Sequence, residues 1–256
     1  MASLKEVKGR IASVNSTRKI TSAMKMVASA KLHKAQAAIE SMLPYERRLH
    51  HILTDFMSNC TEVTSPFIVK REVKKVAVVV FASNTSLCGG FNANVIRHLV
   101  DLLAEYKPLG LENILVFPVG KKVADAVRKL GFRIEGDFQH MADKPSYQEA
   151  ADLAADLMKR FLHGDVDKVE LLYNHFKSTA SQILTRETYL PIDLNNEKKE
   201  EERTIDYILE PSAEELMQEM LPKVLRMKMF TVLLDSNAAE HAARTMACLL
   251  YTSPSP

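Results

Sequence analysis

The residues best placed to carry chemistry form the run Asn84-Thr-Ser-Leu-Cys-Gly-Gly-Phe-Asn92, which follows an apolar, strand-like run and precedes a helix-like one. Phosphate loops of α/β folds occupy this position, because glycine admits a ligand close to the backbone and a helix N-terminus favours an anion. The run matches neither G-x-x-x-x-G-K-[ST] nor G-x-G-x-x-G. We therefore interpret it first as a structural turn or protein contact, with a ligand loop as the alternative.

The remaining reactive residue types form no catalytic or metal-binding pattern. Cys88 has no histidine or acid marked out as its partner, so a packed thiol is favoured over a nucleophile. The three cysteines contain no C-x-x-C pair, which argues against a disulfide framework or zinc site and favours a reducing compartment. His50 and His51 are adjacent and point to different helix faces. The sequence thus predicts no catalytic, cofactor-binding or metal-binding residue.

A long basic helix is predicted at the N-terminus, over residues 3–43. Ser3 and Glu6 form an S-x-x-E capping box, and no proline occurs before Pro44. Residues 1–34 carry eight Lys or Arg side chains against the single acid Glu6. This bias predicts either the solvated face of a coiled coil or a rod held by an acidic partner. Nucleic-acid binding is a third reading, although aromatic stacking residues are absent before Tyr45.

A heptad pattern indicates that this helix pairs with a second one. Nine of twelve heptad positions between Leu4 and Met42 are apolar, and the exceptions are consecutive: Arg18, Thr21 and Lys25. At the exceptions the apolar stripe shifts by one residue, to Ile20, Met24 and Val27. The second helix is expected to begin at another capping box, in residues 211–215, and to kink or restart at Pro222. The two stripes predict an antiparallel coiled coil.

Between these helices the chain alternates strand-like and helix-like runs, which predicts an α/β layer with a mostly parallel, Rossmann-like sheet and a later antiparallel edge. The expected strands are 75–81, 113–119, 132–134, 166–173, 182–189 and 204–209, and the expected helices are 93–106, 122–130 and 146–162. The charged run 195–203 is expected to be a solvated loop. The predicted parts are therefore an N-terminal coiled-coil helix (1–58), a central α/β domain (74–210), an incomplete C-terminal coiled-coil helix (211–250) and an atypical tail (251–256). With no apolar stretch of about 20 residues, any membrane role is expected to be peripheral.

Five runs of the sequence form a recognisable set: Leu4-Lys-Glu-Val-Lys8, Arg10-Ile-Ala-Ser-Val14, Thr17-Arg-Lys-Ile-Thr-Ser-Ala-Met-Lys-Met-Val-Ala28, Leu87-Cys-Gly-Gly-Phe-Asn92 and Glu240-His-Ala-Ala-Arg-Thr-Met246. In this order they resemble motifs of F-type ATP synthase gamma subunits. Two features depart from that family. Asn84 and Ser86 replace the Asp and Gly of its S-D-[RK]-G-L-C-G-G loop, and the residues after Ala247 do not continue its helix. The resemblance therefore implies a truncated or frameshifted C-terminus.

The resemblance implies a non-catalytic rotor shaft that needs no cofactor, transmits rotation between a ring of c subunits and a catalytic ring of alpha and beta subunits, and regulates ATPase activity. It nominates Arg10, Arg18, Lys19, Met24, Lys25 and Arg244 as contacts to the alpha/beta ring. It nominates Gly89, Gly90, Tyr207 and Glu210 as contacts to epsilon and the c ring. It implies peripheral attachment to the cytoplasmic face of a bacterial plasma membrane and no nucleic-acid partner. The alternatives are a nucleotide-binding enzyme centred on 84–92 and a basic coiled coil that binds nucleic acid.

Overall fold

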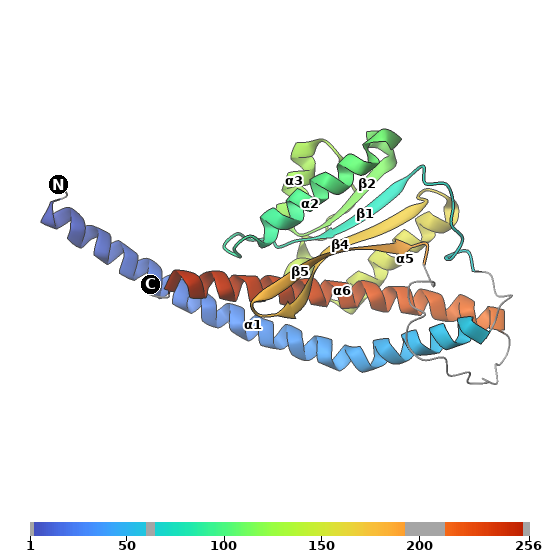
Figure 1. Ribbon diagram of the computed structural model, residues 1–256, viewed down its shortest axis with the longest axis horizontal. Helices are drawn as coiled ribbons and strands as arrows, with labels where there is room; N and C mark the ends of the chain where they lie inside the picture. Colours follow the sequence, from blue (N-terminus) through green and yellow to red (C-terminus); the bar gives the residue numbers. More distant parts are fainter. Residues whose placement is uncertain (1–2, 60–64, 193–212, 253–256) are drawn as a thin grey trace.

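Two long helices and an α/β layer make up the computed structural model, which describes residues 3–59, 65–192 and 213–252. Helix α1 (Leu4–Asn59) and helix α6 (Ala213–Thr252) lie side by side, and the α/β layer covers one side of α6 (Figure 1). The predicted capping box is present in part, since the Glu6 amide donates to Ser3 Oγ at 3.3 Å. Within the parts described, no helix is long and apolar enough to cross a membrane.

Both helices run through the prolines that were expected to limit them. Helix α1 continues through Pro44 to Asn59, past the uninterrupted run 3–43 and close to the bound of residue 58 expected for the N-terminal helix. Helix α6 continues through Pro222, so the expected restart there is wrong. A proline inside a helix leaves the carbonyl four residues earlier without its donor. Residues 40 and 218 are exposed, and solvent can therefore satisfy those two carbonyls.

The predicted coiled coil forms, but only over part of α1. Leu32 and Ala35 of α1 pack against Ala238 and Ala242 of α6, where small side chains let the helices approach closely. An antiparallel register that pairs Leu32 with Ala242 places Thr252, ten residues further along, opposite residue 22. Helix α1 extends beyond that point (Figure 1). Its earlier apolar heptad residues are accordingly exposed: Leu4, Val7, Ile11 and Val14.

The sheet confirms the α/β prediction, with strand order β3-β2-β1-β4-β5. The strands are β1 (Val76–Phe81), β2 (Ile114–Val119), β3 (Arg133–Ile134), β4 (Lys168–Ser178) and β5 (Ser181–Leu190). Strands β1 to β4 pair in parallel and β5 pairs antiparallel with β4, as expected for the later edge. This order is that of doubly wound nucleotide-binding folds. The predicted strand 204–209 and loop 195–203 lie outside the described residues.

Helices cover both faces of the sheet and give it two apolar cores. Helices α2 (Phe91–Tyr106) and α3 (Lys121–Leu130) pack on one face, whereas α5 (Tyr147–His163) and α6 pack on the other. The short helices are η1 (Lys107–Leu109), η2 (Leu111–Asn113) and α4 (Gln139–Asp143). Because both faces are covered, β1 is buried at every position, which explains its continuous apolar sequence.

Helix α6 connects the sheet to the coiled coil. Its N-terminal half packs on the sheet and α5 through Leu221, Leu225 and Met229, and its C-terminal half packs on α1. Strand β4 is also fixed to it, because the Asp235 carboxylate accepts hydrogen bonds from the Phe176 amide at 2.8 Å and from His175 Nδ1 at 2.7 Å. The loop that follows β1 also contacts the C-terminal half of α6, because Cys88 packs with Ala239 and Ala243.

Candidate functional site

The loop between β1 and α2 is held together by its own polar groups. The Ser83 amide donates to Asn92 Oδ1 at 3.1 Å, and Asn92 Nδ2 donates to Ser83 Oγ at 2.8 Å and to Cys88 Sγ at 3.2 Å. Ser83 Oγ also donates to the Thr85 carbonyl at 2.6 Å. Cys88 is 2% exposed and packs against Ala239 and Ala243 of α6. The thiol is therefore a packing group, as the sequence favoured.

The two departures from the family loop both fit this geometry. Asn84 Oδ1 accepts from the Lys121 amide at 2.8 Å, and Asn84 Nδ2 donates to the Gln139 carbonyl at 2.8 Å. The second bond requires an amide, because an ionised aspartate has no donor there. The left-handed φ angles of the turn fall at Leu87 (+66°) and Gly89 (+60°). Ser86 adopts no such angle, so this turn does not require glycine at that position.

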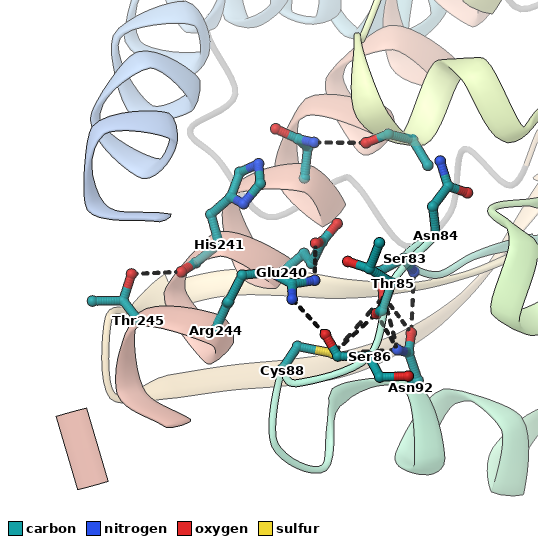
Figure 2. Close-up of polar contacts among 12 residues, drawn as sticks. Ser83, Asn84, Thr85, Ser86, Cys88, Asn92, Glu240, His241, Arg244 and Thr245 are labelled. Atoms are coloured by element: carbon teal, nitrogen blue, oxygen red, sulfur yellow. Dashed lines mark hydrogen bonds and ion pairs between the residues drawn. The ribbon is translucent and has the colours of Figure 1, made fainter. Parts of the chain in front are cut away.

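Helix α6 occupies the crevice in which doubly wound folds bind nucleotides. That crevice lies outside the carboxyl ends of the strands, where the order reverses between β1 and β4. Here Asn237 Nδ2 donates to the Ala142 carbonyl at 2.9 Å, and Arg244 Nη1 donates to the Ser86 carbonyl at 2.5 Å (Figure 2). The cavity left beneath, lined by Phe81 and Asn237 among others, measures about 10 Å³. This volume holds about one water, so the crevice has no room for a nucleotide.

A buried ion pair anchors α6 to this loop. Arg244 Nη2 donates to Glu240 Oε1 at 2.6 Å, and the two residues are 9% and 7% exposed. Burial raises the pKa of the Glu240 carboxyl above its usual value, and the Arg244 guanidinium offsets part of that rise. Figure 2 shows Arg244 directed from α6 toward Ser86. The pair therefore fixes the position of the loop relative to the coiled coil.

His241 is a second buried titratable group at this junction. Burial, together with the positive charges of Lys31 and Arg244, lowers the pKa of His241 to about 4. The imidazole is thus neutral at pH 7, and its Nδ1 has no hydrogen-bond partner in the described part of the chain. Glu240 and His241 belong to a motif quoted from the sequence, but neither was nominated as a site residue. The sequence does contain a signal for the ion pair, because Glu240 and Arg244 are four residues apart and are surrounded by alanines.

The structure separates the nominated ring contacts into three groups. Arg10, Arg18 and Lys19 are exposed on the unpaired part of α1, whereas Met24 and Lys25 are partly buried where the pairing with α6 begins. Arg10 also forms an ion pair with Glu6 at 2.6 Å. Arg244 differs from all of these, because its guanidinium is buried and bonded within the chain.

The nominated epsilon and c-ring contacts also divide. Gly89 lies beside the C-terminal part of α6, since a Cβ added to it would meet Ala247 Cβ at 3.8 Å. Gly90 follows it and is the N-cap residue of α2, which begins at Phe91. Tyr207 and Glu210 lie outside the described residues, in the segment that leads to the start of α6 at Ala213. Gly89 therefore lies beside the C-terminal part of α6, whereas Ala213 is the first residue of that helix. At 1.5 Å per residue, Ala213 and Ala247 are about 50 Å apart.

Comparisons with known proteins agree on one family. A family model described as ATP synthase matches residues 3–249. An ATP synthase gamma chain of Phocaeicola vulgatus is 79% identical, with 98% of this chain and 88% of that relative covered. One from Bacteroides thetaiotaomicron is 60% identical over the same shares.

Solved structures support the fold. A chain of the Tetrahymena thermophila mitochondrial ATP synthase central stalk and c ring superposes with a TM-score of 0.62 at 22% identity, covering 91% of this chain and 100% of that one. A chain of the Euglena gracilis mitochondrial ATP synthase rotor gives 0.60 at 18% identity, covering 95% and 88%. Among the residues described here, no cluster of three or more His, Cys, Asp or Glu side chains could hold a metal.

Proposed function

The chain belongs to the ATP synthase gamma-chain family, and from this membership we propose that it is the central-stalk rotor subunit of a proton-translocating F-type ATP synthase. In this role it is non-catalytic and regulates ATPase activity by transmitting rotation between a c ring and a ring of alpha and beta subunits. Each orientation of an asymmetric shaft presents different contacts to each catalytic subunit, which gives those subunits different nucleotide affinities.

The observation that carries this proposal is the basic, exposed face of a long helix. Helix α1 is 56 residues long. Residues 1–34 carry eight basic side chains, and seven of them are exposed, including Lys31 and Lys34 where α1 is paired with α6. Long, exposed Lys and Arg side chains form weak, exchangeable contacts with acidic surfaces. A rotating shaft needs such contacts, because no orientation can be bound too tightly.

The contact zone is proposed to include Arg10, Arg18, Lys19, Met24 and Lys25 directly. Arg244 is proposed to act indirectly, by holding the loop at Ser86, because its guanidinium is already bonded within the chain. The proximity of Gly89 to Ala247 supports placing Gly89 and Gly90 in this zone rather than at the c-ring end. Tyr207 and Glu210 remain the proposed contacts to epsilon and the c ring.

The cellular setting is proposed from the relatives. The gamma chains of Phocaeicola vulgatus and Bacteroides thetaiotaomicron are bacterial. We place this chain at the cytoplasmic face of a bacterial plasma membrane, attached peripherally through epsilon and the c ring. Its functional parts are the shaft formed by α1 and α6 and a foot formed by the sheet and its helices.

Replacing both Arg18 and Lys25 with leucine tests the contact zone. Lys25 lies where pairing begins, and Arg18 lies beyond it, so the double variant is expected to leave the α1–α6 seam almost unchanged and to weaken contacts with the ring. In reconstituted vesicles, the ratio of ATP-driven proton pumping to ATP hydrolysis should fall several-fold. Lys129→Leu, at an exposed position on α3, is the matched control. An unchanged ratio in the double variant would refute this assignment.

A further inference from the structure

A groove of about 480 Å³ lies where α1, α6, α4 and the β1–α2 loop meet. Its volume is within the range of small-molecule sites, which is about 300–1,000 Å³. It is distinct from the nucleotide crevice of the sheet, because that crevice is filled by α6. The groove is formed by side chains from four separate elements, so it exists only when the shaft is packed against the sheet.

One wall of the groove is the shifted apolar stripe of α1. Ile20, Met24 and Val27 are the residues to which the stripe moves where the heptad fails, and all three line the groove with Ala23 and Ala28. The coiled coil does not use them, since Ile20 is 60% exposed and Val27 is 59% exposed. The irregularity in the heptad thus produces an apolar surface that faces a polar one.

The opposite wall carries balanced charge. Glu240 and Arg244 neutralise each other, and His241 is neutral at pH 7. Lys31 and Asp143 also line the groove, and neither side chain has an ion pair or hydrogen bond to another described residue. The groove therefore offers one unused cation, one unused carboxylate and no net charge.

We propose that this groove binds a small, uncharged amphipathic molecule whose polar end is a primary amide or a similar group that both donates and accepts hydrogen bonds. The apolar body lies against Ile20, Met24 and Val27. The amide N–H donates to the Asp143 carboxylate, and the amide carbonyl accepts from the Lys31 ammonium. A charged ligand of either sign satisfies one of these groups and is repelled by the other.

Three probes of similar size test the charge of the ligand. They are 4-butylbenzamide, which is uncharged, 4-butylbenzoate, which is negative, and 4-butylbenzylammonium, which is positive. Binding to the full chain is measured by NMR of 13C-labelled methionine methyl groups. Met24 lines the groove, whereas Met26 on the same helix is 66% exposed and does not. The benzamide should shift the Met24 signal saturably and leave Met26 unchanged. Both charged probes should bind at least about tenfold more weakly.

Variants test the location and the charge balance separately. Ala23→Phe should fill the groove and weaken benzamide binding at least about tenfold, whereas Ala30→Phe, at an exposed position outside it, should not. Asp143→Asn leaves the groove net positive and should shift the preference toward the benzoate. Lys31→Gln should shift it toward the benzylammonium.

Several results would overturn the proposal. They are no saturable shift of the Met24 signal in the unaltered chain, equal binding of all three probes, and binding that Ala23→Phe leaves unchanged. A charge preference that does not respond to Asp143→Asn or Lys31→Gln would also overturn it, because simple apolar adhesion to α1 gives that result. The shift of the Met24 signal is measured on the unaltered chain, so the proposal can be refuted even if a variant fails to fold.

Discussion

Replacing Arg244 with methionine should destabilise the chain by about 3 kcal/mol at pH 7. The change keeps an apolar side chain in place but removes both guanidinium hydrogen bonds, to Glu240 Oε1 and to the Ser86 carbonyl. Deleting one partner of a buried ion pair costs about 3–5 kcal/mol, because the other charge is left buried. We expect the lower end of this range, since burial already raises the pKa of Glu240 and the carboxyl can take up a proton.

The assay is urea unfolding, with a matched control on the same helix. Lys223 pairs with Glu219 at the same four-residue spacing, but the two side chains are 58% and 76% exposed. Lys223→Met should therefore cost no more than about 0.5 kcal/mol. Adding Glu240→Gln to Arg244→Met should restore more than half of the lost stability. An Arg244→Met cost as small as that of Lys223→Met would refute the role given to the buried pair.

Two further predictions concern titration and backbone geometry. The folded pKa of His241, about 4, is below the ordinary histidine value of 6.5, so the folded state loses stability as the pH falls from 6.5 to 4, by about 3 kcal/mol in all. His241→Leu should remove that part of the pH dependence of urea unfolding, and identical profiles for both chains would contradict it. At Gly120, φ is +114° and a Cβ would lie within 2.2 Å of the Ala82 carbonyl oxygen. Gly120→Ala should cost at least about 3 kcal/mol, whereas Gly131→Ala, at φ +76° in open space, should cost about 1 kcal/mol; equal thermal unfolding would contradict this.

Local patterns were sufficient to predict the class of fold. The apolar run Val76–Phe81 and its successors predicted the strands because a strand covered on both faces needs no polar alternation. Element ends were harder to predict, as Pro44 and Pro222 show. A proline limits a helix only when the carbonyl it leaves free cannot find another donor, and exposure to solvent is a property of the folded chain.

The burial of individual residues could not be predicted from the sequence, because it depends on contacts between residues that are far apart along the chain. The heptad pattern treated Leu4 and Leu32 alike, yet only Leu32 is buried, because Leu32 packs against Ala238 and Ala242 of α6. Arg244 was nominated as a contact to the alpha/beta ring from its motif alone. Its burial follows from the loop at Ser86, 158 residues earlier in the sequence. A pattern within a short stretch of sequence cannot indicate a contact between residues so far apart along the chain.

If this chain is the rotor shaft of an ATP synthase, it must assemble with alpha and beta subunits. The assembly can be tested by coexpressing the full chain with the alpha and beta chains of Phocaeicola vulgatus, whose gamma chain is 79% identical. We expect affinity purification through a tag on beta to recover this chain with both partners, and high salt to weaken the association because basic side chains carry it. Recovery of an alpha–beta assembly that leaves this chain behind at low salt would show that it is not the rotor shaft.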